Sequence, residues 1–314
     1  MGRNMGKIAF LFSGQGSQYA GMGQDLYNNC PVAREIFEQA DQVLGYELSR
    51  ICFLGPQEEL NRTENTQPAI LATSIAAYQA LRISGILPDV VAGFSLGEYS
   101  ALVCAEVLTF QDAVKLVRQR GLFMQQAVPE GRGGMAAVLG LEASIIEELV
   151  QEVKNMGIIS IANYNCPGQI VISGEKAALE AIEPKLLERG AKRLIPLQVS
   201  GPFHTSLMEP AAEKLRQEIS HLKLGQPKYP LISNVTADYV RDAFHLAELL
   251  PQQVQSSVLW EMTIRKMIAD GVNVFVEIGP GKTLRGFIKK IDKNVKLLNV
   301  EDMDSLEKTI SFGG

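Results

Sequence analysis

The sequence lacks the long apolar runs that mark membrane proteins. No uninterrupted run approaches the ~20 residues that a membrane-spanning helix needs, so no membrane segment is expected. Two basic residues stand near the start, but residues 1–14 pass directly into an apolar strand and a glycine-rich turn, which is not the layout of a signal peptide. These absences predict a protein that is not exported.

Cysteine is scarce and scattered. The four cysteines, Cys30, Cys52, Cys104 and Cys166, form no C-x-x-C pair and have no neighbouring histidine. This pattern is typical neither of a disulfide framework nor of a metal site. The simplest interpretation is four reduced thiols in a cytoplasmic protein without a bound metal.

An excess of positive charge is also missing. The 30 lysines and arginines stand against 35 acidic residues, which gives a net charge of −5. Because nucleic-acid binding needs clustered basic residues, a general nucleic-acid partner is not expected. The 314 residues, 46% of them hydrophobic, can bury a large core, which predicts one large domain with an insertion, or two domains.

Residues 90–102 contain the pattern of a strand, a sharp turn and a helix, VVAGFSLGEYSAL. Gly93 and Gly97 flank Ser95 at the spacing of the G-x-S-x-G nucleophile elbow, whose tight turn holds the serine hydroxyl above the sheet. The turn also points backbone N–H groups at the start of the next helix, where they can hold an oxyanion. An ordinary glycine-rich turn between a strand and a helix has the same bare pattern.

Histidine is the usual general base beside a serine nucleophile, and the chain has only three. His221 falls late in a polar helical pattern and His245 falls in the helical pattern 244–250, which favours surface or packing roles for both. His204 follows an apolar strand and the turn Ser-Gly-Pro, so it is expected on a loop at a strand end, where catalytic side chains are commonly held. No carboxylate between Ser95 and His204 has a context that marks it as a third triad member.

The apolar runs predict two kinds of sheet. Buried strands of a parallel sheet are expected at residues 7–12, 90–93, 272–278 and 296–300, and covering helices include 31–44, 67–84 with Pro68 near its start, 110–127, 211–223 and 244–250. Between them, strands at 133–140, 158–163, 169–173 and 192–199 and helices at 142–154 and 175–189 give the order βαββαβ. This order is typical of a ferredoxin-like unit, which places a small inserted domain at 128–198 and a substrate cleft beside it.

Five segments occur together in one order: FLFSGQGSQ, GFSLGEYSAL, ANYNCPGQIVISG, VSGPFHTSLM and EIGPGKTLRG. In their order and separations the chain resembles the malonyl-CoA:acyl-carrier-protein transacylases of bacterial fatty acid synthesis, from about residue 7 to about residue 300. The resemblance implies an α/β fold, with an α/β-hydrolase-like large domain formed by 1–127 and 199–314 around a mostly parallel sheet. The ferredoxin-like domain at 128–198 is inserted into it.

The resemblance implies a Ser95–His204 dyad without a catalytic carboxylate. The backbone N–H groups of Gln15 and Leu96 are implied as the oxyanion hole. A backbone carbonyl orients the histidine in this family, and counting back from the single tryptophan places it at Gln253, on a loop. That alignment lacks the proline that the family usually has nearby.

The resemblance also implies a carboxylate anchor. Arg118 and Arg120 both lie in helix 110–127, where exposed arginines are usually solvated. The family pattern R-G-x-x-M selects Arg120, whose planar guanidinium suits a bidentate pair with the free carboxylate of a malonyl group.

Further substrate contacts are implied at Asn163, Asn165, Gln169 and Phe203. An asparagine ahead of Pro-Gly is more often a turn former than a ligand contact, but the family interpretation has these amides line the cleft. Phe203 directly precedes the histidine, a feature that in this family accompanies preference for malonyl over methylmalonyl groups. One departure concerns Phe94, which stands where the family usually has histidine.

The implied activity is a ping-pong transfer of malonyl from malonyl-CoA to the phosphopantetheine thiol of acyl carrier protein, without a metal or redox cofactor, by a monomer. Three alternatives remain: a discrete acyltransferase of a polyketide pathway, a serine thioesterase or lipase, and a non-catalytic scaffold. The acidic carrier protein is expected to dock on basic surface, for which the candidates are Arg189, Lys192, Arg193, Lys282, Arg285, Lys289 and Lys290.

Overall fold

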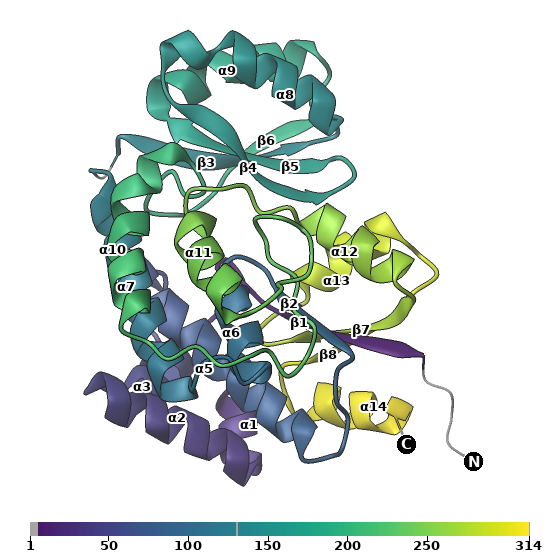
Figure 1. Ribbon diagram of the computed structural model, residues 1–314. Helices are drawn as coiled ribbons and strands as arrows, with labels where there is room; N and C mark the ends of the chain where they lie inside the picture. Colours follow the sequence, from purple (N-terminus) through teal and green to yellow (C-terminus); the bar gives the residue numbers. More distant parts are fainter. Residues whose placement is uncertain (1–5, 130, 314) are drawn as a thin grey trace.

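The computed structural model describes residues 6–129 and 131–313. Residues 1–5, Glu130 and Gly314 lie outside this part. The first residues of the stretch 1–14, which is not expected to be a signal peptide, are therefore not described. The same holds for Glu130, one residue of the expected small domain. The chain forms two separate four-stranded sheets, one parallel and one antiparallel (Figure 1). No helix of the described part is both long and apolar enough to cross a membrane.

The parallel sheet has the strand order β2–β1–β7–β8. Its strands are β1 (Lys7–Phe12), β2 (Val90–Gly93), β7 (Val272–Ile278) and β8 (Lys296–Val300), at the bounds that the apolar runs predict. Along β1, Phe10 and Phe12 join one buried cluster while Ala9 and Leu11 join another. The strand is therefore buried on both faces, which explains its continuous apolar run.

The antiparallel sheet has the order β4–β5–β3–β6 and is covered on its outer face by two helices, α8 and α9, at the top of Figure 1. In chain order its elements are β3 (Gly133–Leu139), α8 (Ala143–Glu152), β4 (Ile159–Cys166), β5 (Gln169–Glu175), α9 (Lys176–Glu188) and β6 (Arg193–Pro196), with a short 3₁₀ turn at Lys154–Met156. The predicted βαββαβ order is confirmed. The last strand is shorter than predicted: it ends at Pro196, and residues 197–199 line the cavity described below.

Helices pack on both faces of the parallel sheet. They are α1 (Gln24–Asn29), α2 (Pro31–Leu44), α3 (Leu48–Leu54), α4 (Gln57–Leu60), α5 (Thr63–Arg82), α6 (Gly97–Cys104), α7 (Phe110–Ala127), α10 (Glu209–Ser220), α11 (Ala243–Gln253), α12 (Trp260–Ala269), α13 (Thr283–Ile291) and α14 (Met303–Gly313), and a 3₁₀ turn spans Ser206–Met208. His221 lies just after α10, not inside it as predicted, and His245 lies in the first turn of α11. Neither residue lines the cavity that contains Ser95.

Helix α5 begins four residues earlier than predicted, so Pro68 lies inside it rather than near its start. A proline cannot donate to the carbonyl four residues before it, which here is that of Glu64. Arg118 of α7 donates to this carbonyl instead, with an Nη1–O distance of 2.7 Å, and also to Asn65 Oδ1 at 2.6 Å. The general expectation that Arg118 is a solvated surface residue is therefore wrong, since the side chain joins α7 to α5.

Candidate active site

The turn between β2 and α6 holds Ser95 in a left-handed conformation, with φ of 51°. A Cβ atom on Gly93 would lie 1.9 Å from the backbone of Gly97, and one on Gly97 would lie 2.1 Å from the carbonyl oxygen of Phe12. No side chain fits at either position, so the two glycines allow the backbone to turn directly above the end of β1. This geometry is that of a nucleophile elbow.

Asn234 fixes this turn from a distant loop. Its Oδ1 accepts from the Ser95 N–H at 2.6 Å, and its Nδ2 donates to the Gly93 carbonyl at 2.7 Å. Two backbone groups that a strained turn leaves without helix or sheet partners are thereby satisfied. Asn234 could not be predicted from the sequence, because nothing local to it indicates that it reaches a turn 139 residues earlier in the chain.

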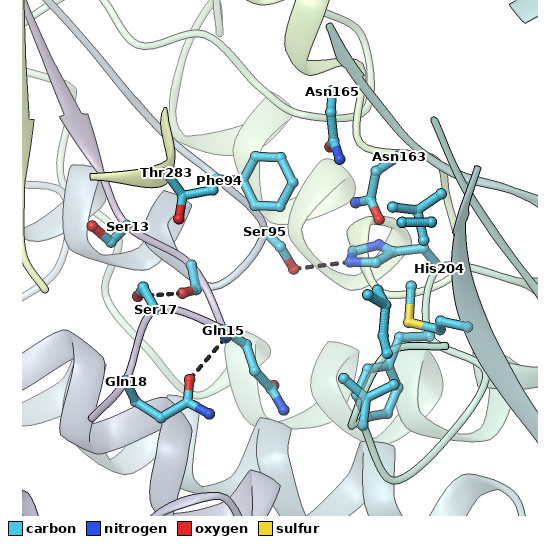
Figure 2. A pocket seen from close by; sticks show the side chains of 18 of the residues that line it. Ser13, Gln15, Ser17, Gln18, Phe94, Ser95, Asn163, Asn165, His204 and Thr283 are labelled. Carbon is cyan, nitrogen blue, oxygen red and sulfur yellow. Dashed lines mark hydrogen bonds between the residues drawn. The ribbon is translucent and has the colours of Figure 1, made fainter. Parts of the chain in front are cut away.

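His204 faces Ser95, and its Nε2 lies 2.9 Å from the serine Oγ (Figure 2). Its Nδ1 lies 2.9 Å from the carbonyl oxygen of Gln253 and 3.0 Å from that of Ser256. Because both carbonyls only accept, the ring proton belongs on Nδ1 and Nε2 is left to accept from the serine hydroxyl. Burial, together with the nearby Arg120 charge, lowers the pKa of His204 to about 4, which keeps the imidazole neutral.

The residue that contacts His204 from behind is the predicted one, Gln253, but it is the last residue of α11 and not part of a loop. No carboxylate in the described ranges bonds to the imidazole. The amide side chain of Gln253 is itself buried and bonded on both sides, as described below.

The two backbone N–H groups expected to hold an oxyanion come from separate segments. Leu96 lies at the N-terminus of α6, and Gln15 lies in the turn after β1. Within residues 6–129 and 131–313, neither N–H donates to a protein acceptor, whereas the neighbouring Gly16 N–H donates to Gln18 Oε1 at 2.8 Å. The Gln15 side chain points away, and donates to Thr63 Oγ1 at 3.3 Å.

Arg120 is buried, with 1% of its surface exposed, and lies beside the nucleophile. Its Nη1 donates to Gln67 Oε1 at 2.9 Å, and its Nη2 donates to Gln253 Oε1 at 3.0 Å and to Ser95 Oγ at 3.3 Å. The guanidinium also lies over the ring of Tyr99, 5.4 Å from its centre. Burial lowers the pKa of Arg120, but an arginine stays charged in proteins. No carboxylate of the described chain approaches it within salt-bridge distance.

These groups line a cavity of about 600 Å³ that runs between the two sheets. Its wall includes predicted site residues from both parts of the chain: Gln15, Ser95, Arg120, Asn163, Asn165, Gln169, Phe203 and His204. Leu96 and Gln253 lie behind the wall. Nowhere in the described residues do three His, Cys, Asp or Glu side chains come together as metal ligands would.

The polar residues of β4 and β5 reach the cavity from the antiparallel sheet. Figure 2 shows Asn163 beside the His204 ring and Asn165 farther along the same strand. Asn165 is buried, and its Oδ1 has no hydrogen-bond partner in the described chain. Gln169 is already engaged, because its Oε1 accepts from Lys290 of α13 at 3.0 Å.

Phe94 gives the nucleophile an apolar neighbour. Its ring packs at 5.4 Å, edge to face, against Trp260 and at 6.1 Å against Phe287. Phe94 and Phe287 both line the cavity. An aromatic side chain therefore lies next to the reacting serine, at the position where the resemblance implies that the family usually has histidine.

Two buried glutamates near the cavity escaped the sequence analysis. Glu98, in the first turn of α6, accepts from Gln253 Nε2 at 2.6 Å and from the Asn234 N–H at 3.3 Å. Glu277, at the end of β7, accepts from the N–H groups of Leu284 and Arg285 at 3.0 and 2.8 Å. Burial raises the pKa of each to about 7. The only signals in the sequence were the position of Glu98 close to Ser95 and that of Glu277 just before the glycine-rich turn that follows β7.

Comparison with known proteins gives a family for this geometry. Residues 9–307 match the family model described as "Acyl transferase domain". The chain is 49% identical to the malonyl CoA-acyl carrier protein transacylase of Bacillus subtilis (strain 168), over 98% of this chain and 97% of that protein. It is 44% identical to the protein of the same name from Haemophilus influenzae, over 98% and 99% of the two chains.

Solved structures agree in fold. The malonyl CoA-acyl carrier protein transacylase of Clostridium perfringens superposes with a TM-score of 0.94 at 47% identity, covering 97% of this chain and 96% of that one. A malonyl-transacylase solved in complex with a type II PKS acyl-carrier protein superposes with a TM-score of 0.95 at 42% identity, covering 97% and 99%. The predicted combination of an α/β-hydrolase-like domain with a ferredoxin-like insertion is confirmed.

Proposed function

The chain belongs to the acyl transferase family and, within it, to the malonyl-CoA:acyl-carrier-protein transacylases, and on this premise we propose that Ser95 carries the malonyl group between two thiols. The enzyme transfers malonyl from malonyl-CoA to the phosphopantetheine thiol of acyl carrier protein and so supplies fatty acid synthesis.

In the first half-reaction, Ser95 attacks the thioester carbon of malonyl-CoA while its hydroxyl proton passes to His204 Nε2. The 2.9 Å contact between Oγ and Nε2 and the neutral state of the imidazole support this role. The N–H groups of Gln15 and Leu96 hold the oxyanion. When the C–S bond breaks, the departing sulfur takes the proton from His204 and leaves as CoA thiol.

The second half-reaction reverses these steps with a different thiol. The phosphopantetheine thiol of acyl carrier protein gives its proton to His204 and attacks the malonyl ester of Ser95. The bond between Oγ and the acyl carbon then breaks, and the proton returns to the serine. The carbonyls of Gln253 and Ser256 keep the imidazole in the required orientation throughout.

The burial of Arg120 without a carboxylate partner is the observation that favours a diacid substrate. Its guanidinium is buried 3.3 Å from Ser95 Oγ and is bonded to neutral amides rather than to a carboxylate. A buried arginine without a counter-charge costs several kcal/mol, and the free carboxylate of a malonyl group removes that cost. A thioesterase or lipase that acts on neutral acyl chains has no use for such a group, and the intact dyad argues against a non-catalytic scaffold.

The remaining cavity residues fit a small acyl group. Phe203, buried beside the base, narrows the space near the α-carbon and favours malonyl over methylmalonyl. Asn163, Asn165 and Gln169 line the path along which the thioester and its pantetheine arm enter. Equal loading rates with methylmalonyl-CoA and malonyl-CoA would contradict the proposed role of Phe203.

The reaction needs no metal or redox cofactor, because the dyad, two N–H groups and an arginine supply every step. We place the large domain at 1–127 and 199–314 and the small domain at 128–198, and we infer a cytoplasmic monomer without a nucleic-acid partner. A polyketide pathway remains the second candidate, since one similar structure is a complex with a type II PKS carrier protein.

The structure narrows the basic residues available for carrier-protein docking. Arg189 already pairs with Glu148, and Lys282 pairs with Glu301. The exposed candidates without an ion pair in the described chain are Lys192, Arg193, Lys289 and Lys290. Charge reversal at Lys192, Arg193 and Lys289 is expected to raise the KM for carrier protein and to leave malonyl-CoA loading unchanged. Lys290 is left in place in this test, because it also donates to Gln169 of the cavity wall.

Intact mass of the protein after brief exposure to malonyl-CoA tests the central proposal, with Ser95→Ala as the control. The expected result is one malonyl adduct on the wild type only, which is discharged when holo acyl carrier protein is added. Free malonate without an adduct would instead indicate a thioesterase. Discharge rates with carriers from fatty acid and polyketide systems separate the two pathways.

A further inference from the structure

Glu98 and Arg120, an acidic and a basic side chain, are each buried at 1% exposure, yet they do not contact each other directly. The side-chain amide of Gln253 stands between them. Its Oε1 accepts from Arg120 Nη2 at 3.0 Å, and its Nε2 donates to Glu98 Oε2 at 2.6 Å. The acidic and basic side chains are thus connected through one neutral group.

Only one orientation of this amide satisfies both neighbours. A carboxylate accepts hydrogen bonds and a guanidinium only donates them. If the Gln253 amide were flipped, its N–H₂ group would face the N–H groups of Arg120. Its oxygen would then face the carboxylate oxygen of Glu98. The Nε2 group of Gln253 also donates to the Ser95 carbonyl at 2.9 Å. Glu98 therefore determines which end of Gln253 faces the arginine.

Glu98 is well placed for this task. It follows Ser95 by three residues in the first turn of α6, and its Oε2 also accepts from the Asn234 N–H. The carboxylate thus joins the nucleophile turn, the loop that fixes it and the end of α11. Burial raises the pKa of Glu98, while the bonds from Gln253 and Asn234 favour its charged form.

A direct ion pair would have a different consequence. If Glu98 contacted Arg120 itself, a carboxylate of the protein would occupy the place that the proposed reaction gives to the substrate carboxylate. Because an amide oxygen intervenes, the guanidinium is held in position by a neutral acceptor, and its charge remains to be matched by the substrate.

We propose that Glu98 is a positioning residue for substrate selection: it orients the Gln253 amide so that Arg120 is met by an oxygen without charge and stays open to a malonyl carboxylate. The inference rests on the proposed function. It predicts that a change at Glu98 slows the loading of Ser95 by a diacid thioester more than it slows reactions that need only the Ser95–His204 pair.

The test compares two reactions of Ser95. Malonyl-CoA loading requires Arg120, whereas labelling by a serine-directed fluorophosphonate requires the dyad and the oxyanion hole but no carboxylate anchor. Glu98→Leu removes the acceptor that orients Gln253. Relative to labelling, malonyl loading is expected to fall on the order of 10- to 100-fold, the range of one hydrogen bond to a charged group. Glu98→Gln, which keeps an acceptor oxygen, is expected to restore much of the loading.

A second variant decides the question even if Glu98→Leu does not fold. The double exchange Glu98→Gln with Gln253→Glu keeps the composition and the acid–amide pair but turns the carboxylate toward Arg120. Its ratio of malonyl loading to labelling is expected to be at least about tenfold lower than that of Glu98→Gln alone. The ratio is compared because Gln253→Glu also removes the donor to the Ser95 carbonyl and slows both reactions of the serine. Equal ratios in these two variants, or a proportional loss of labelling and loading in Glu98→Leu, would overturn the proposal. A wild type without a malonyl adduct would contradict the proposed function instead.

Discussion

Two glycine-rich turns follow strands β2 and β7, which lie on either side of β1 in the parallel sheet, and the turns have different functions. Between β2 and α6, glycines are required because the backbone passes within contact distance of β1, and Ser95 takes the strained position. Between β7 and α13, Gly279 and Gly281 have positive φ values of 118° and 82°, and the helix N-terminus is bonded to the chain's own Glu277. A glycine-rich turn at a helix start binds an external anion only where its N–H groups are not already used.

The steric difference between Gly97 of the first turn and Gly281 of the second predicts the largest effect. Gly97→Ala places a Cβ atom 2.1 Å from the Phe12 carbonyl oxygen, which displaces Ser95. Since a misplacement of about 1 Å can cost about 100-fold in rate, malonyl-adduct formation is expected to fall at least that much. Adduct formation by intact mass and the melting temperature are the measurements.

Gly281→Ala is the matched control in the other turn. A Cβ there has nothing nearer than 3.6 Å, so only the positive φ opposes the change. The expected cost is about 1–2 kcal/mol of stability, with unchanged adduct formation. If both variants lose activity equally, the contrast between the turns is wrong.

The loop that fixes the elbow predicts the next largest effect. Asn234→Ala removes the acceptor of the Ser95 N–H and the donor to the Gly93 carbonyl. With two buried backbone groups left without partners, at about 1–3 kcal/mol each, we expect slower labelling and slower malonyl loading in the same proportion. A selective loss of malonyl loading would show that Asn234 acts through Arg120 instead.

Glu277 predicts a smaller effect, on stability. The folded protein holds this proton up to a pH of about 7, because burial raises the pKa of Glu277 from 4.5. The unfolded chain releases it near pH 4.5, so between these values the folded state binds more protons, and this contribution to the unfolding free energy decreases as the pH rises. Glu277→Gln lacks this contribution.

Urea unfolding at pH 5 and pH 8 measures the Glu277 prediction. The unfolding free energy of Glu277→Gln minus that of the wild type is expected to be larger at pH 8 than at pH 5. The opposite order would mean that the helix N-terminus holds Glu277 as a carboxylate with a lowered pKa, and that the second turn is a strong anion site after all.

The smallest expected effect concerns the pH dependence of the elbow. Because burial and Arg120 lower the pKa of His204 to about 4, the base is already neutral at pH 5. Fluorophosphonate labelling of Ser95 is therefore expected to change little between pH 8 and pH 5 and to decline as the pH approaches 4. A midpoint near 6.5 would show an ordinary, solvated histidine.

The sequence was most informative where neighbours along the chain determine the structure. The bounds of β1, β2, β7 and β8 follow from apolar runs, and the G-x-S-x-G spacing places the elbow on Ser95. Pro68 was misplaced because its compensation comes from Arg118, which the helical pattern of α5 alone cannot reveal.

The side chains that organise the site were the hardest to predict. Asn234, Glu98 and the amide of Gln253 act across separations of more than 130 residues, and each looks ordinary in its own segment. Gln253 was found only through the family resemblance, which supplied its backbone carbonyl but gave no reason to examine its side chain.

The order of strands has a consequence for how the chain folds during synthesis. Lys7 at the start of β1 pairs with Val272 at the start of β7, so the middle of the parallel sheet joins the two ends of the chain. At about 5–20 residues per second, β1 leaves the ribosome tens of seconds before β7. The antiparallel sheet, complete between Gly133 and Pro196, closes through local pairings and is free to form earlier. Because pairings between residues far apart in the sequence slow folding, we expect the closure of the parallel sheet to be the slow step.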